Sequence, residues 1–209
     1  MSTIPSSWMD QFVLQERGPA EVLTPFRQTL AAASMLARVA EDRTGLTLRE
    51  YDVMSSAKYQ ALILAELAQQ LDEQVAELSA EADRSRHSGP EPDRTLIGSL
   101  TGAVRTTATL VEVCHALLRV AESLLVVRTT KTRMELAAAI ETLRAAVGTS
   151  QITIQANLSR ITDARTYDQL AEGLPTFDRI RGHADRIAEV LRQRTAPIGF
   201  QARRADLVG

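Results

Sequence analysis

The chain has 209 residues, of which 44% are hydrophobic, 24% charged and 4% aromatic, and its formal net charge at pH 7 is −2. A chain of this length is expected to form one large domain or two small ones, with a core that needs no disulfide or metal ion. The balanced charge excludes a general nucleic-acid-binding protein, which needs excess cationic surface. The apolar residues are mainly Ala and Leu rather than aromatic or β-branched, so we exclude an all-β fold and predict an all-α protein.

The first three predicted helices are separated by Pro and Gly. A short first helix ends at Gly18-Pro19, and a second one runs from Thr24, its predicted N-cap, to about Gly45. A third, long helix begins near Thr47 and continues to the loop at residues 85–93, which we expect to be locally disordered.

The second half of the chain predicts three more helices. They cover approximately residues 96–124, 136–161 and 177–191, with a polar interruption at residues 128–133. We therefore predict a single bundle of about six helices in residues 1–194 and a loose tail at residues 195–209. Because several helices are apolar on more than one face, we also expect a buried seam between two copies.

The cysteine count and the N-terminal sequence predict the compartment. Cys114 is the only cysteine, so no intrachain disulfide can form. The N-terminus lacks the basic and apolar regions of a signal peptide, and no stretch reaches the ~18 consecutive apolar residues of a membrane helix. We expect a cytoplasmic protein with no membrane partner.

General motifs for catalysis and metal binding are weak in this sequence. It has no glycine-rich phosphate loop, and His87, His115 and His183 are isolated, so no metal site is predicted. Cys114 and His115 are adjacent on a helix and cannot face each other, so we expect Cys114 to fill the core rather than act as a nucleophile. His183 lies beside an apolar stripe and is expected to serve packing.

Several segments, taken in order, are similar to those of one protein family. Leu23-Thr-Pro-Phe-Arg-Gln-Thr-Leu-Ala-Ala32 stands where that family has Thr-Pro-Gly-Gly-Gly-Ser-x-Ala-Ala. The strongest stretch is Ala137 to Gly148, followed by Thr153-Ile-Gln-Ala-Asn-Leu158 and Ile161-Thr-Asp163. The chain resembles the formiminotransferase-cyclodeaminase C-terminal family, which includes methenyltetrahydrofolate cyclohydrolases. The resemblance implies a cyclodeaminase-like helical bundle, a small-molecule ligand and a homodimer.

The departures from the family pattern suggest a changed pocket. Phe26, Arg27 and Gln28 replace the three glycines of the turn, and their side chains would obstruct a ligand at the helix N-terminus. Before the fifth helix, the family's Ser-Asp becomes Thr132-Arg133. The pocket implied by the resemblance is therefore more cationic, which favours an anionic ligand over a cationic folate intermediate.

These comparisons assign candidate roles to seven residues. Asp163 and Lys131 are the acid–base candidates, and Arg27 and Arg133 would hold an anion. Asn157 would position the substrate, and the remaining substrate-binding candidates are Thr24 and Gln28. For each of them the alternative is a solvated or structural side chain.

Three functions remain open from the sequence. The first is a cyclodeaminase-like enzyme acting on a C–N bond or imine of a small molecule outside folate metabolism, for example in a biosynthetic pathway. The second is a cyclohydrolase or cyclodeaminase that still uses a tetrahydrofolate derivative as its substrate. The third is a non-catalytic helical protein that binds a ligand or a partner. We rank them in this order and predict no cofactor with certainty.

Overall fold

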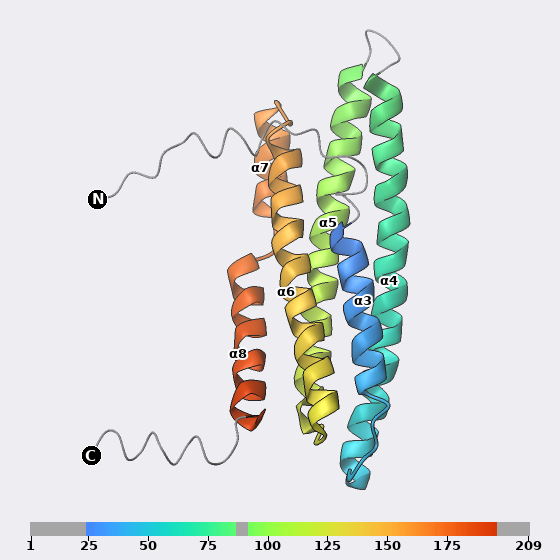
Figure 1. Cartoon of the computed structure of the whole chain (residues 1–209). Helices are drawn as coiled ribbons and strands as arrows, with labels where there is room; N and C mark the ends of the chain where they lie inside the picture. The colour runs from blue at the N-terminus through green and yellow to red at the C-terminus, as the bar shows by residue number, and fades with distance from the viewer. Residues whose placement is uncertain (1–23, 87–91, 196–209) are drawn as a thin grey trace, which may run out of the picture.

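The computed structural model describes residues 24–86 and 92–195, which are entirely helices and connecting turns, without a strand (Figure 1). The all-α prediction is confirmed. The elements in chain order are α3 (Thr24–Val39), α4 (Leu48–Arg86), α5 (Pro92–Ser123), the 3-10 helix η1 (Leu124–Val126), α6 (Thr130–Leu158), α7 (Ala164–Glu172) and α8 (Phe177–Thr195).

Five of these helices match predicted ones, with corrections at their ends. The second predicted helix was expected to reach Gly45, but α3 ends at Val39. α6 begins at Thr130, inside the predicted interruption, because Thr129 is its N-cap and accepts a hydrogen bond from the Thr132 N–H. α7 was not predicted, since only Leu170 among its nine residues is buried. The short first helix and residues 196–209 of the predicted tail lie outside the described residues.

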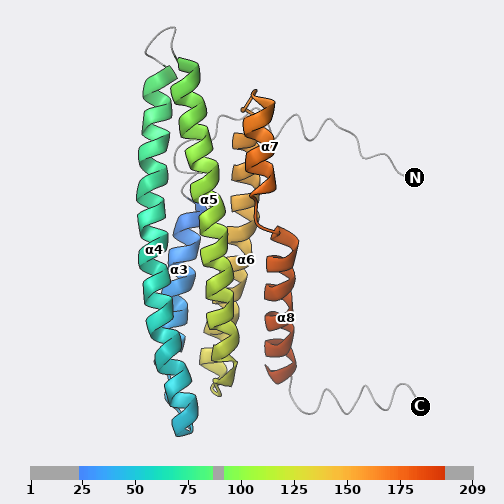
Figure 2. The same cartoon turned by 180° about the vertical axis from the view of Figure 1, so that it is seen from behind.

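Helices α3, α4, α5 and α6 form the centre of the bundle. α3 and α5 run in one direction, and α4 and α6 run in the opposite direction (Figure 1). α8 packs mainly on α6, while α7 contacts α5. Figure 2 shows α7 and α8 following each other along the side of the bundle away from α4. Because α3 has 16 residues and α4 has 39, α3 lies beside only part of the bundle's length.

Small and branched apolar residues fill the interior. The larger core cluster joins α3, α4, α5, α6 and α8, and its fully buried members include Phe26, Met54, Leu117 and Leu143. Cys114 belongs to this cluster, which confirms that it fills the core. Buried alanines such as Ala32, Ala61 and Ala139 let the helices approach closely. None of the described helices combines the length and apolar content needed to cross a bilayer.

The turn between α3 and α4 explains why α3 ends early. Gly45 has φ +67°, in the left-handed region that side chains disfavour. Glu50 then accepts hydrogen bonds from the Thr47 N–H and hydroxyl, both at 2.8 Å, and its own N–H donates to the Thr47 hydroxyl at 3.3 Å. This reciprocal pair forms a capping box that starts α4.

Alanine substitutions at two glycines should change the free energy of unfolding in opposite directions. Gly45→Ala places a side chain at positive φ and should lower the free energy of unfolding by about 1 kcal/mol. Gly148→Ala should raise it by about 0.5–1 kcal/mol, because Gly148 is inside α6 and an added Cβ meets no atom within 4 Å. Chemical denaturation of the two variants measures both changes. A Gly45→Ala protein as stable as the wild type would contradict the turn conformation.

Candidate functional site

Polar residues interrupt the apolar faces of α5 and α6 at one height of the bundle. The larger core cluster ends at Leu110 on α5 and at Val147 on α6, and a smaller cluster beyond them contains Val104 and Ile154. Between the two clusters lie four buried hydroxyl residues, which we call the polar layer: Thr106, Thr107, Ser150 and Thr153.

The contact between α3 and α5 places this layer beside the start of α3. The hydroxyl of Thr29 lies 3.2 Å from the Cys114 sulfur. Thr107 precedes Cys114 by two helical turns on the same face of α5, or about 10 Å. α3 runs in the same direction and begins about 7.5 Å before Thr29. Thr107 therefore lies close to the first turn of α3.

The contact between α3 and α6 also places the polar layer near the start of α3. Just after α3 ends, Asp42 accepts a hydrogen bond from the Thr132 hydroxyl. Ser150 follows Thr132 by five turns and shares its face, about 27 Å along α6. Since α6 runs opposite to α3, and α3 begins about 22 Å before its end at Val39, Ser150 lies near the level of the start of α3.

The first turn of α3 and the residue after it carry the three side chains that the sequence resemblance places in the positions of the family's glycines. Phe26 is fully buried and belongs to the larger core cluster, so it packs inward rather than over the helix end. Arg27 is exposed and Gln28 is half-buried. The replacement thus leaves two side chains, not three, on the accessible side of this turn.

Asp72 of α4 is the carboxyl group beside this turn. Burial raises the pKa of Asp72, and the nearby positive charge of Arg27 opposes that rise. Sequence reasoning did not select Asp72, because α4 carries many acidic residues. Its position next to Leu71, on the edge of the buried face of α4, was the available signal.

Three buried polar atoms at this height have no hydrogen-bond partner among the described residues. They are the Gln28 Oε1, Asp72 Oδ1 and Ser150 Oγ atoms. By contrast, the Thr107 hydroxyl donates to the Ala103 carbonyl at 2.8 Å, within its own helix. Buried polar atoms are nearly always paired in proteins, so this set can receive a small polar ligand.

Comparison with known proteins identifies the family at this point. The model of the formiminotransferase-cyclodeaminase family matches residues 31–175. The chain belongs to this family. Its fold is similar to a solved formiminotetrahydrofolate cyclodeaminase from Thermotoga maritima, with a TM-score of 0.70 and 12% identity, covering 91% of this chain and 95% of that one. No curated protein sequence matches the chain.

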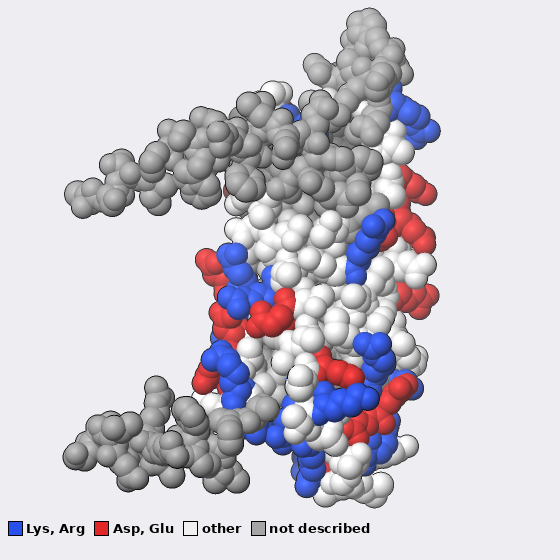
Figure 3. Space-filling model, in the orientation of Figure 1, with Lys and Arg blue, Asp and Glu red and all other residues white. Residues whose placement is uncertain are grey.

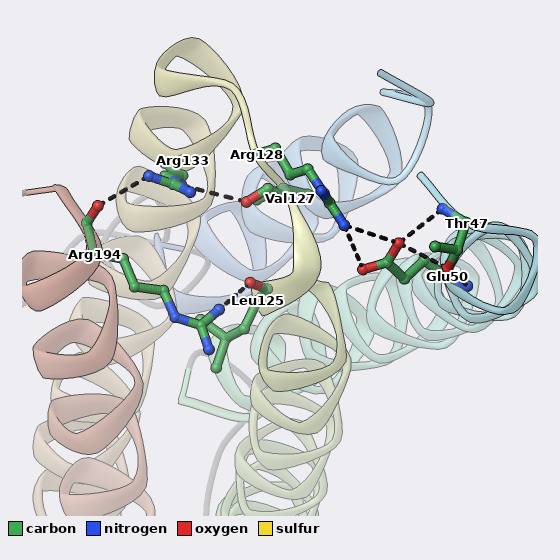
Figure 4. A network of polar contacts seen from close by, with 7 residues as sticks. All are labelled: Thr47, Glu50, Leu125, Val127, Arg128, Arg133 and Arg194. Atoms are coloured by element: carbon green, nitrogen blue, oxygen red, sulfur yellow. Dashed lines mark hydrogen bonds and ion pairs between the residues drawn. The ribbon is translucent and has the colours of Figure 1, made fainter. Parts of the chain in front are cut away.

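Arg133, one of the two predicted anion holders, joins α6 to α8. Its guanidinium donates to the Arg194 carbonyl at 2.9 Å and to the Val127 carbonyl at 3.3 Å, while Arg194 donates back to the Leu125 carbonyl (Figure 4). Arg133 lies beside the end of α3, whereas Arg27 lies at its start, about 20 Å away along the helix. The structure does not bring the two arginines into one pocket.

Lys131 lines a separate hollow at the end of α3. This hollow has a volume of about 410 Å³ and is lined by Arg38, Asp42, Thr44, Thr129, Lys131, Thr132 and Glu135. Asp42 accepts hydrogen bonds from the hydroxyls of Thr129 and Thr132 and from the Thr44 N–H, which lower its pKa strongly. Charged side chains of both signs gather at this end of the molecule (Figure 3). Lys131 is thus about 27 Å from the polar layer.

Asp163 and Asn157 lie toward the opposite end. The exposed Asp163 is the N-cap of α7 and accepts hydrogen bonds from the Thr166 hydroxyl at 2.5 Å and N–H at 2.8 Å, which lower its pKa. Asn157 is half-buried and follows Ser150 by two turns on the same face of α6. Of the predicted residues, the structure therefore gathers Thr24, Arg27 and Gln28 beside the layer, with Asn157 about 10 Å beyond it.

Cys114, His115 and His183 lie outside the polar layer. Burial raises the pKa of Cys114 to about 12, which keeps the thiol protonated. His115 and His183, distant in the sequence, meet edge to face between α5 and α8 with ring centroids 5.7 Å apart, and Glu122 lies 3.2 Å from His183. In the described part of the chain, no three His, Cys, Asp or Glu side chains are placed to hold a metal ion.

The hydrogen bonds of Asp42, just after the end of α3, should make a pH-dependent contribution to the free energy of unfolding. Asp42→Asn should lower the free energy of unfolding at pH 7 by about 1–2 kcal/mol, because a carboxylate accepts these bonds better than an amide. Since folding lowers the pKa of Asp42, this stability is present above the unfolded value of 3.8 and is lost as the pH falls through the folded value.

Urea denaturation at several pH values measures the difference between the wild type and Asp42→Asn. The difference should shrink below pH 4. Glu135→Gln, in the same hollow, is the control and should change stability little. A difference that stays constant down to pH 2 would contradict the role of the Asp42 carboxylate.

Proposed function

We propose that the chain is a cyclodeaminase- or cyclohydrolase-type enzyme that acts on a C–N bond of a one-carbon tetrahydrofolate derivative at the polar layer. The observation that carries the proposal is the set of unpartnered buried atoms on α3, α4 and α6 beside the first turn of α3. In the sequence resemblance, this turn, Thr24-Pro25 and the residues after it, corresponds to the family's Thr-Pro-Gly segment. The family relationship supplies the class of reaction.

The residues at this height fit the needs of such chemistry. Hydrolysis of an amidinium adds water to the carbon, which requires a group that takes a proton and one that returns it to the leaving nitrogen. Asp72 offers a carboxyl group, Gln28 an amide and Ser150 a hydroxyl, each with an atom that has no hydrogen-bond partner among the described residues. Together they can bind, orient and exchange protons with a polar substrate.

The charge distribution favours folate as the first substrate to test. The hypothesis of a ligand outside folate metabolism rests on Arg27 and Arg133 sharing a pocket. Because these arginines lie at opposite ends of α3, and because Asp72 lies near Arg27, the site is not strongly cationic. A substrate outside folate metabolism stays a hypothesis for the same site, as does a ligand-binding protein without activity.

The wild type should hydrolyse methenyltetrahydrofolate or release ammonia from formiminotetrahydrofolate. Ser150→Val and Gln28→Leu should each lower kcat/KM by roughly 10- to 100-fold, since each removes one polar contact to the transition state. Ultraviolet absorbance follows the first reaction, and a coupled ammonia assay follows the second.

Ser34→Ala is the matched control. Ser34 is exposed on α3 and donates only to the Leu30 carbonyl of its own helix, at 2.9 Å, so activity should not change. No turnover of either folate by the wild type would overturn the folate proposal. Folate binding without turnover would favour a non-catalytic protein.

We also infer that two copies pair through the outer face of α4. Tyr59, Leu62, Ile63 and Leu67 are between 37% and 68% exposed and lie within three turns on one side of this helix. The opposite side, with Ala57, Ala61 and Ala68, packs into the core. A helix that is apolar on both sides is typical of one buried on both sides.

Two acidic substitutions should separate the copies. Leu62→Glu combined with Ile63→Glu should convert a dimer to a monomer, because charge would be buried at the seam. Sedimentation equilibrium measures the mass. Met134→Glu, at an apolar residue that is 66% exposed on α6, is the control and should leave the mass unchanged. A wild type that sediments as a monomer would contradict the pairing.

A further inference from the structure

Asp72 differs from the other described carboxyl groups whose pKa is shifted. Hydrogen bonds or ion pairs lower the pKa values of Glu41, Asp42, Glu50 and Asp163, so these carboxylates serve as fixed acceptors. Burial raises the pKa of Asp72, and its buried Oδ1 atom has no hydrogen-bond partner in the part of the chain that the structure describes. Asp72 is therefore free to change its protonation state during a reaction.

Its surroundings hold Asp72 in place. The neighbouring Leu71 is 8% exposed and Val75 is fully buried, so this turn of α4 is anchored in the core. Asp72 is half-buried at the edge of that anchored face. A carboxyl group on a packed helix keeps a defined position relative to a ligand.

Arg27 supplies the balancing charge. It is exposed in the first turn of α3, and its positive charge lowers the pKa of Asp72 against the larger effect of burial, while the negative charge of the neighbouring Glu73 raises that pKa. Arg27 therefore favours the ionised form of Asp72, against the effect of burial. A base must be ionised to accept a proton and must hold that proton well enough to be an acid afterwards.

We propose that Asp72 is the proton-transfer group of the site and that Arg27 is a positioning residue that tunes it, an inference that rests on the proposed function. In hydrolysis of an amidinium, the Asp72 carboxylate takes one proton from water as the oxygen bonds to the carbon. The C=N π pair moves to nitrogen, which gives a neutral carbinolamine and a protonated Asp72.

The second half of the reaction returns the proton. Protonated Asp72 gives it to the ring nitrogen, the C–N bond breaks, and its electron pair stays on that nitrogen. The carbinolamine oxygen forms the carbonyl of a formyl group and releases its own proton to solvent. One water is consumed and one proton is released overall, without an oxidant or reductant.

Kinetics of the full chain test the assignment. Asp72→Asn should lower kcat by at least 100-fold with KM changed less than threefold, and it should remove the acidic limb of the pH–rate profile. Glu77→Gln, at an exposed position on the same helix, is the control and should behave as the wild type. Full activity of Asp72→Asn in a wild-type-active background would overturn the inference.

The position of the acidic limb of the pH–rate profile tests the role of Arg27 separately. Arg27→Gln removes a charge that lowers the pKa of Asp72, so the acidic limb should move to higher pH, and Arg27→Lys should restore it. A uniform loss of kcat without a shifted limb would mean a purely structural Arg27 and would overturn its tuning role.

Carboxyl carbon NMR separates this inference from the folate proposal. The Asp72 resonance, assigned by its absence in Asp72→Asn, should titrate above the usual aspartate range in the wild type and higher still in Arg27→Gln. This result would support the proton-transfer assignment even if neither folate is turned over. A resonance that titrates at or below the usual value would overturn it.

Discussion

The short length of α3 is the constraint on which the site depends. α4, α5 and α6 have 39, 32 and 29 residues, whereas α3 has 16. Alongside α3, the inner faces of α5 and α6 are apolar. Near the start of α3, the same faces carry hydroxyl residues instead. Because α3 is shorter than the other three central helices, its N-terminus lies inside the length of the bundle. Beyond that N-terminus, polar side chains of α5 and α6 do not have to pack against apolar residues of α3.

The two ends of α3 show how structural and functional polar groups differ. At its end, Asp42 and Glu50 have hydrogen bonds to threonine hydroxyls or backbone N–H groups, and Arg128 lies 3.1 Å from Glu50. These contacts lower the carboxyl pKa values and hold a turn and two helix starts together. At its start, the buried Gln28, Asp72 and Ser150 atoms have no such partners within residues 24–86 and 92–195. Charge density alone would favour the end of α3 rather than its start, where we propose the site.

Much of the fold follows from the sequence because long apolar periodicity is a strong signal. α4, α5 and α6 repeat apolar residues over many turns, and their predicted spans agree with the structure to within six residues, the largest difference being at the start of α6. The end of α3 was missed because it depends on the φ of Gly45 and on the Asp42 side chain, which a helical pattern does not reveal. α7 was missed because it buries one residue.

The site is harder to predict because it depends on which residues of neighbouring antiparallel helices lie at the same level of the bundle. Arg27 and Asp72 are far apart in the sequence, and their charges come near enough to interact only because α3 and α4 form a hairpin. Arg133 was placed in the pocket from a segment match, but its height depends on the pairing of α6 with α3. A resemblance therefore selects segments, whereas the packed helices decide which of their residues share a site.

The geometry also changes what the arginines imply about the ligand. Arg133 binds two backbone carbonyls with its forked guanidinium, a structural task that suits arginine better than lysine. Arg27 then remains as the one cation of the first turn of α3, with Asp72 nearby. Ionised Asp72 and Arg27 sum to no net charge, so a cationic amidinium meets no uncompensated positive field there. The replacement of glycine by Arg27 is thus compatible with the cationic intermediates of folate chemistry, because its charge is matched across the α3–α4 hairpin.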